Sequence, residues 1–474
     1  MTATRSRALV ALLAGSTLLT ACAAVPNLGP RPEMRPAQSL ASAASLAPSA
    51  EAWPQDQWWS VYKDVQLDQL MTEALAGAPD LAAASARLRT AQGYAQQAGA
   101  ALAPQIDASA SAGVVQQSEN NGIPSQIVPG GWKQTAKIGL SFSLDLDLWG
   151  KNRATLAAAR SDVDARRFEL AEARLALTTN IAASYADLAK LHAQRDVLLS
   201  AVAIYEDTLK LVAARVETGL DTRAELKQAQ SRVPTARADL AATDEAIALT
   251  RNAIAALLGA GPDRGLSIAR PNVAILQIRG VPANGPIDLV GRRPDIAAAR
   301  AGVEAAASRI KAARADFFPN ISISGLIGLQ SLGFSNLLLG SSAFGNAGPA
   351  VTLPIFHGGA ISGQYRGARG QYDEAVARYD AQVVQAFREV ADAAVSRKML
   401  DERLGQSRQA LADAEEANAL ARQRYAGGLS TYLDVLNAEA GVLQARRSVA
   451  ELETRAFAID VAMVRALGGG FAAS

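Results

Sequence analysis

Few residues in this chain have side chains that could do chemistry. The 474 residues include one cysteine and two histidines. The histidines, His192 and His357, lie far apart in sequence, and neither belongs to a catalytic motif. The glycines at 468–470 follow a predicted helix instead of preceding one, so they do not form a phosphate-binding loop. The sequence therefore predicts no catalytic site, no metal site and no cofactor, and we expect the protein not to be an enzyme.

The single cysteine, Cys22, follows a basic start and a short apolar run. Basic residues, an apolar stretch and small residues before a cleavage point are typical of an export signal. The tetrad Leu19-Thr20-Ala21-Cys22 resembles the lipobox of bacterial lipoproteins. The resemblance implies cleavage before Cys22 and lipid attachment to its thiol and new amino group. An ordinary signal peptide with a chance cysteine is the alternative.

Composition and charge narrow the classes of protein to which this chain could belong. Hydrophobic residues make up 49% of the chain and aromatic residues 5%, which favours long, closely packed helices over a large globular core. The formal net charge is +2, and Arg5 and Arg7 lie in the segment expected to be removed. The mature chain is then near neutral, so we expect no nucleic-acid partner. No apolar run reaches the ~18–20 residues that a membrane-spanning helix needs.

A turn that the sequence uses twice carries the other residues of interest. Residues 215–226 and 424–435 share arginine, glycine, leucine, threonine and an acid at a constant offset of 209. Gly219 and Gly428 end one long segment, and a threonine three residues later begins the next. Glycine tolerates the left-handed conformation that closes a helix, and threonine caps the following helix. The chain therefore holds two helical hairpins with matching tips.

Two periodicities predict the elements that position these turns. Alternation of apolar and polar residues predicts strands at about 105–115, 136–148, 319–330 and 348–356, each near the length of a tilted membrane strand. Heptad spacing of apolar residues predicts coiled-coil hairpins at 152–258 and 359–467, with a kink or bend at Pro234. Each half of the chain thus has the order helix, strand, strand, long helix, shorter helix.

These elements predict a domain organisation with two repeats. We expect a signal peptide at 1–21, a lipidated tether at 22–62, a first repeat at 63–260, a linker at 261–290, a second repeat at 291–468 and a tail at 469–474. Four strands cannot close a barrel, and open sheet edges are costly in lipid. Two chains would give eight strands and three would give twelve. Polar alternate residues such as Ser141, Ser143 and Asp145 suit a wide, water-filled barrel.

The second repeat begins with Arg292-Arg293-Pro294-Asp295-Ile296, followed by Ala312, Ala315, Phe317-Phe318-Pro319 and Ile321. This pattern and the two turns resemble the outer membrane factors, or TolC-like channel proteins, in the lipoprotein branch related to nodulation protein T. The resemblance spans about residues 53–468. It implies a mainly helical homotrimer, with a twelve-stranded outer-membrane β-barrel continued by an α-helical barrel into the periplasm. It also implies a periplasmic adaptor and an inner-membrane transporter of the resistance-nodulation-division type as partners.

The resemblance assigns roles to the turns. Gly219, Leu220, Gly428 and Leu429 match the family's adaptor-docking tips, although helix termination alone would also explain the glycines. We expect Arg292 and Arg293, at the start of the second repeat, to have a structural role.

Gate residues follow from the same resemblance. Asp434 stands where the family carries a gating aspartate, and Asn437 stands where some members have a second acid. Glu225 is the equivalent acid of the first turn. Both acids also have the spacing of a capping box, so a capping role is the alternative.

The leading interpretation is an outer-membrane exit duct for drug-type efflux, anchored by lipid and spanning the outer membrane. A duct for type I protein secretion is the alternative within that class. From another class, a periplasmic adaptor or coiled-coil scaffold lipoprotein is possible. The two hairpins and four membrane-length strands argue against it.

Overall fold

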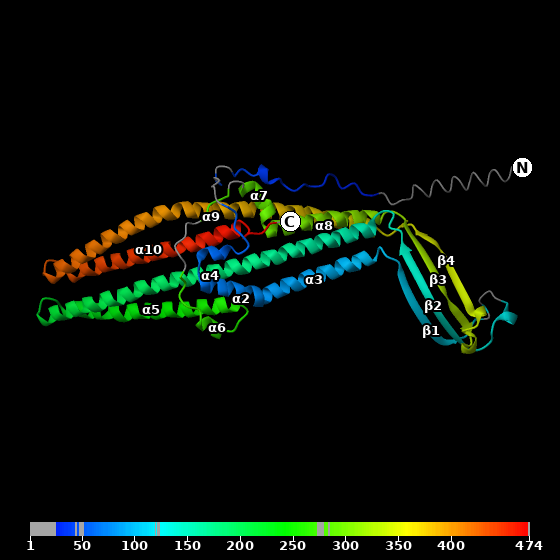
Figure 1. Cartoon of the computed structure of the whole chain (residues 1–474), viewed down its shortest axis with the longest axis horizontal. Helices are drawn as coiled ribbons and strands as arrows, with labels where there is room; N and C mark the ends of the chain where they lie inside the picture. The colour runs from blue at the N-terminus through cyan, green and yellow to red at the C-terminus, as the bar shows by residue number, and fades with distance from the viewer. Residues whose placement is uncertain are drawn as a thin grey trace. The chain divides into compact units, whose positions relative to one another are not determined.

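The computed structural model describes residues 25–42, 45–46, 52–118, 120, 124–272, 279–282 and 285–472. Cys22 and the predicted signal peptide lie outside these residues. The described chain is mainly helical, with one four-stranded sheet (Figure 1). Its helices are α2 (Val65–Gly77), α3 (Pro79–Ala100), α4 (Lys151–Glu217), α5 (Arg223–Leu257), α6 (Asp263–Leu266), α7 (Gly285–Arg292), α8 (Pro294–Ala315), α9 (Ala360–Ala426) and α10 (Tyr432–Ala466).

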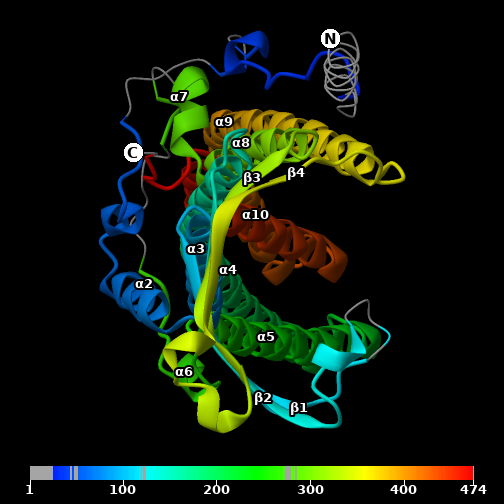
Figure 2. The same ribbon diagram turned by 90° about the vertical axis from the view of Figure 1, so that its right-hand side faces the viewer.

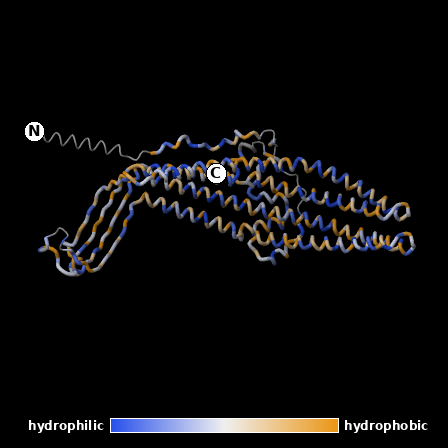
Figure 3. The backbone as a smooth tube through the Cα atoms, turned by 180° about the vertical axis from the view of Figure 1, so that it is seen from behind, coloured by the Kyte–Doolittle hydropathy of each residue, from blue (hydrophilic) through white to orange (hydrophobic). Residues whose placement is uncertain are grey.

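The strands are β1 (Gln105–Val115), β2 (Lys133–Asp145), β3 (Asn320–Leu332) and β4 (Ala343–Thr352), and all neighbours are antiparallel in the order β1-β2-β3-β4. The central pair joins the two halves of the sequence, with Leu140 opposite Ile327. β1 and β4 are the edges of the sheet that one chain forms. Hydrophilic and hydrophobic residues alternate along the strands (Figure 3). The period-two pattern therefore predicted the strands' type correctly.

Two strand boundaries differ from the sequence-based expectation. β2 ends at Asp145 and not near 148, because Asp147 adopts a left-handed conformation with φ 45° and its carboxylate caps the start of α4. β4 covers Ala343–Thr352 and not 348–356. Its last residue, Thr352, pairs with the first residue of β3, Asn320, so no partner remains for the residues beyond it.

The chain divides into two compact units. Unit 1 comprises Met1–Met34, Leu88–Arg166 and Ala299–Tyr379, and it contains the sheet. Unit 2 comprises Arg35–Arg87, Arg167–Ala298 and Asp380–Ser474, and it contains both hairpin tips. Within unit 2, α5 lies beside α4 and α10 lies beside α9 (Figure 2). Pro234 is accommodated inside α5, which runs unbroken from Arg223 to Leu257.

Unit 2 is stabilised by a core that brings distant segments together. Aromatic residues of the segment before α2 pack against α4 and α10, and the Tyr62 ring meets the Phe457 ring edge-on at 4.6 Å. The hydroxyl of Tyr62 donates to Asp460 at 2.6 Å, so the buried phenol has a partner. Among the described residues, no helix is long and apolar enough to cross a membrane, and Figure 3 shows mixed hydropathy along all of them.

Arg293 explains why the arginine motif before α8 is structural. Its guanidinium is buried and forms ion pairs with Asp295 at 2.6 Å and Glu389 of α9 at 2.7 Å. It also donates to the carbonyl of Ala466 at the end of α10. The neighbouring Arg292 lies over the Trp53 ring at 4.8 Å. One side chain thus ties the start of α8 to α9 and α10.

Candidate docking and gating site

The hairpin tips are closed by the same backbone motif. We call residues 219–222 turn 1 and residues 428–431 turn 2. Gly219 and Gly428 have φ of 74° and 73°, where a side chain would strain the backbone. The N–H of Leu220 donates to the carbonyl of Arg215 at 2.9 Å, and that of Leu429 donates to Arg424 at 2.8 Å. These bonds span five residues and are typical of a Schellman motif.

Both turns then start the next helix with a capping box. The N–H of Thr222 donates to Glu225 Oε2 at 2.6 Å, and that of Thr431 donates to Asp434 Oδ2 at 2.9 Å. The hydrogen bond from the Thr431 backbone lowers the pKa of Asp434 below its ordinary value. Asp434 is nevertheless exposed, as is Asn437 one turn further along α10. Both acids therefore cap helices, and Asp434 also presents its charge to solvent.

Each turn exposes a leucine. The side chains are 65% exposed at Leu220 and 73% exposed at Leu429, and Leu433 follows on the same tip. Large apolar side chains in the open at matching positions are typical of a surface that meets a partner. The four residues that the sequence assigns to docking are thus solvent-accessible in one chain.

Behind the exposed leucines, the two hairpins pack against each other. The buried residues come from all four helices: Val212, Ala229, Tyr425, Tyr432, Val435 and Leu436. The apolar cluster holds turn 1 and turn 2 of one chain side by side.

A polar network sits beside this cluster and links the hairpins. Arg215 Nε pairs with Asp221 Oδ2 at 2.9 Å, and Arg215 Nη1 donates to the carbonyl of Tyr425 at 2.9 Å. The Tyr425 hydroxyl donates to Asp221, and the Arg215 guanidinium lies 4.5 Å from the Tyr425 ring centre. Burial, and then the Asp221 carboxylate, raises the pKa of the Tyr425 hydroxyl above its ordinary value. We call Arg215, Asp221 and Tyr425 the tip network.

Sequence reasoning did not single out the tip network. The available signal was an asymmetry between the repeated turns. At the common offset, Asp221 is replaced by Ser430, and Tyr425 stands where the first copy has Val216. Asp221 and Tyr425 are thus two of the positions at which the copies differ, and these two side chains bond to each other across the hairpins.

Further along α10, the buried carboxylate of Glu439 also connects the two hairpins. Glu439 is fully buried, and its Oε1 accepts a hydrogen bond from Thr208 of α4. Its Oε2 has no hydrogen-bond partner among the described residues. Burial raises the pKa of this carboxyl above its ordinary value, while the charges of Arg422 and Arg232 oppose the rise.

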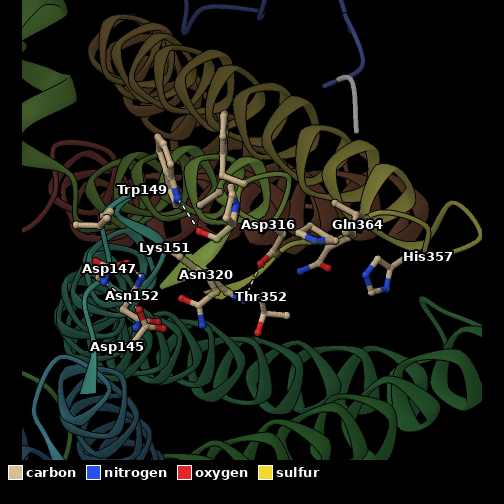
Figure 4. A pocket seen from close by; sticks show the side chains of 16 residues that line it. Asp145, Asp147, Trp149, Lys151, Asn152, Asp316, Asn320, Thr352, His357 and Gln364 are labelled. Carbon is tan, nitrogen blue, oxygen red and sulfur yellow. Dashed lines mark hydrogen bonds and ion pairs between the residues drawn. The ribbon is translucent and has the colours of Figure 1, made fainter. Parts of the chain in front are cut away.

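A hollow in unit 1 lies where the sheet meets the helices (Figure 4). Its volume is about 480 Å³, and acids, aromatics and His357 line it. The acids already have partners, since Lys151 pairs with Asp316 at 2.6 Å. Trp149 stacks on Phe318 with its ring 4.8 Å away and donates to the carbonyl of Pro319. The described residues contain no group of three or more His, Cys, Asp or Glu that could hold a metal ion.

Comparisons with known proteins agree with the geometry. The family model described as outer membrane efflux protein matches residues 70–260 and 287–469. The chain is 30% identical to the multidrug resistance outer membrane protein MdtP of Escherichia coli K12, over 98% of this chain and 96% of that protein. It is 34% identical to the fusaric acid resistance protein FusA of Burkholderia cepacia, over 65% of this chain and 58% of that protein.

Among solved structures, the outer membrane protein VceC of Vibrio cholerae is similar, with a TM-score of 0.84 and 42% identity. The match covers 88% of this chain and all of that one. Both the fold and the order of the elements are therefore shared with outer-membrane channel proteins.

Proposed function

The chain belongs to the outer membrane efflux protein family and is an outer-membrane efflux channel, and we propose that three copies of it form the exit duct of a tripartite pump. In this proposal Cys22 carries the lipid anchor and the helical hairpins extend into the periplasm. A periplasmic adaptor and an inner-membrane transporter of the resistance-nodulation-division type are its partners. The duct is passive, performs no catalytic step and carries drugs or other small molecules.

The open sheet is the observation that supports a trimer. One chain leaves β1 and β4 as edges, and an unpaired backbone group in lipid costs several kcal/mol. Closure between chains satisfies both edges. Twelve strands from three chains leave a lumen, whereas eight strands from two would be filled by side chains.

Conductance and mass together test this function. The purified protein in planar bilayers should conduct ions, and its mass in detergent should be that of three chains. A monomer without conductance would contradict the proposal, and a conducting dimer would contradict the trimer alone.

Adaptor docking is proposed for turn 1 and turn 2, because their leucines are exposed at equivalent positions. Leu220→Asp combined with Leu429→Asp should lower adaptor crosslinking at the tips about tenfold or more, since burying a leucine is worth about 1.5–3 kcal/mol. Leu249→Asp is the matched control, because this leucine of α5 is 60% exposed and lies away from both turns. Equal crosslinking by the double variant and the control would remove the docking assignment.

The tip network, the exposed Asp434 and Asn437, and the half-buried Glu225 are proposed as the periplasmic gate. The network holds the two hairpins of one chain together, so parting them requires its bonds to break. Opening would separate turn 1 from turn 2 and widen the entrance.

A further inference from the structure

The proline-rich segment before α2 is held along α9 by side chains that reach its backbone. Arg369 of α9 donates from Nη1 to the carbonyl of Gly29 at 3.2 Å and from Nη2 to the carbonyl of Pro30. The Tyr372 hydroxyl, one turn further, donates to the carbonyl of Pro32 at 3.1 Å. All of these residues belong to unit 1. In Figure 1 the segment runs along α9.

The two side chains that make these contacts are themselves held in place by their neighbours. The Arg369 side chain is only 12% exposed, and Asp373 fixes it through an ion pair at 2.8 Å. The Tyr372 ring packs against the apolar cluster of Ile310, Ala313 and Ala368. Prolines keep the segment extended with free carbonyls, which the arginine fork can take in pairs. A further contact follows in unit 2, where the N–H of Arg35 donates to Asp380 at 2.9 Å.

The order of the contacts gives the segment a direction. Gly29 lies at Arg369 and Pro32 lies at Tyr372, so the segment runs the same way as α9. Followed back toward Cys22, the chain therefore heads for the start of α9 at Ala360, which residues 353–359 connect to the end of β4.

Chain length then limits where a lipid on Cys22 can lie. Arg369 is nine residues into α9, about 14 Å of helix from its start. Gly29 is the seventh residue after Cys22, and seven residue steps span at most about 24 Å. The lipid can thus reach the start of α9 with about 10 Å to spare, which is far less than the length of β4, about 33 Å.

We infer that Arg369 and Tyr372 form a clamp that sets the position of the lipid anchor. The clamp holds residues 29–32, and the lipid of Cys22 then enters the periplasmic leaflet beside the open edge at β4. The anchor thereby places each chain in register for its neighbour's β1 to pair with that edge. This inference rests on the proposed lipidation of Cys22 and the proposed trimer.

Two changes of tether length test the clamp in the full-length, lipid-modified protein. Deletion of residues 25–28 leaves three residue steps from Cys22 to Gly29, about 10 Å, where about 14 Å is needed. It should lower the yield of detergent-resistant trimer about tenfold. Insertion of four residues after Ala41, beyond the clamp, should leave the yield unchanged. Adding Arg369→Ala and Tyr372→Phe to the deletion should restore the yield. Residues 29–32 are then no longer fixed on α9, so the shortened tether can still reach the membrane.

A deletion without effect, or one that clamp release does not restore, would overturn the inference. Palmitate labelling in every variant separates this result from the proposed lipidation, since loss of label would contradict the latter. A glutamate-specific protease provides a direct readout that does not need the lipid, because Glu33 lies next to the clamped Pro32 and is exposed. In a Cys22→Ala protein, cleavage after Glu33 should be about tenfold faster when Arg369→Ala and Tyr372→Phe are present. Equal cleavage rates would show that no clamp exists.

Discussion

At the scale of single residues, the tip network concentrates the bonds that keep the two hairpins together. Arg215 and Asp221 belong to the first hairpin, and Tyr425 belongs to the second, 204 residues from Asp221. The ion pair itself is local to the first hairpin. The hydroxyl, the carbonyl and the ring of Tyr425 connect this ion pair to the second hairpin.

Tyr425→Phe should therefore open the channel more often. The variant keeps the ring over Arg215 and removes only the hydroxyl, a hydrogen bond to a charged group worth about 1.5–3 kcal/mol. We expect roughly tenfold higher open probability in planar bilayers. Tyr94→Phe is the control, because Tyr94 is exposed on α3. An unchanged open probability would show that the hydroxyl does not hold the gate.

Glu439 predicts a dependence of opening on pH. Burial raises its pKa in the packed hairpins, so the protonated form favours packing at low pH. As the pH rises through the raised value, the carboxylate becomes charged in a buried site and packing loses stability. Thr208 of α4, Arg232 of α5, Arg422 of α9 and Tyr432 of α10 are the groups around it.

Conductance should accordingly increase with pH above the ordinary range of a carboxyl group. Glu439→Gln, which stays neutral and keeps an acceptor for Thr208, should flatten this part of the profile and hold the channel closed at neutral pH. The measurement is the pH profile of conductance for both proteins. A profile that the substitution leaves unaltered would assign the pH effect to other groups.

At the scale of elements, each turn closes one helix and opens the next within four residues. The same carboxylates are both caps and candidate gate charges, and the two roles respond differently to substitution. Asn accepts the hydrogen bond of the cap without the charge, and loss of a threonine cap costs about 1 kcal/mol.

Thr431→Ala should speed hydrogen exchange in the first turn of α10 about fivefold and leave block by multivalent cations unchanged. Asp434→Asn should weaken that block while exchange changes less. Because position 437 is an asparagine, Asp434 is the exposed acid of the two gate positions 434 and 437. We therefore expect block by multivalent cations to be modest. If both variants shift exchange alone, Asp434 is a cap and not a gate.

At the scale of the whole molecule, Arg293 links three helices that the sequence places far apart. Arg293→Ala leaves Asp295 and Glu389 without their shared cation in a mostly buried site. Removal of one partner from such a group costs about 3–5 kcal/mol. Thermal unfolding in detergent should therefore begin at a clearly lower temperature. Arg300→Ala is the control, since its exposed pair with Glu304 is worth at most about 1 kcal/mol. Equal shifts would contradict a structural role for Arg293.

The sequence by itself determined the elements, because their signals are local. A period of two predicted the strands, the heptads predicted the hairpins, and glycine followed by threonine predicted the turns at 219–222 and 428–431. The repeat and the motif at 292–296 predicted the family. The boundaries that failed, at Asp145 and Thr352, depend on a helix cap and on the length of a partner strand.

Only the tertiary structure decided which side chains meet across the fold. Asp221 with Tyr425, Thr208 with Glu439, and Arg369 with Gly29 are separated by some 200 to 340 residues. Such pairs leave no periodic trace, because each is a single contact set by how two hairpins or a tether pack. Hydrophobic repeats specify that a helix has a buried face, whereas the partner of one polar group depends on the register in which those faces meet.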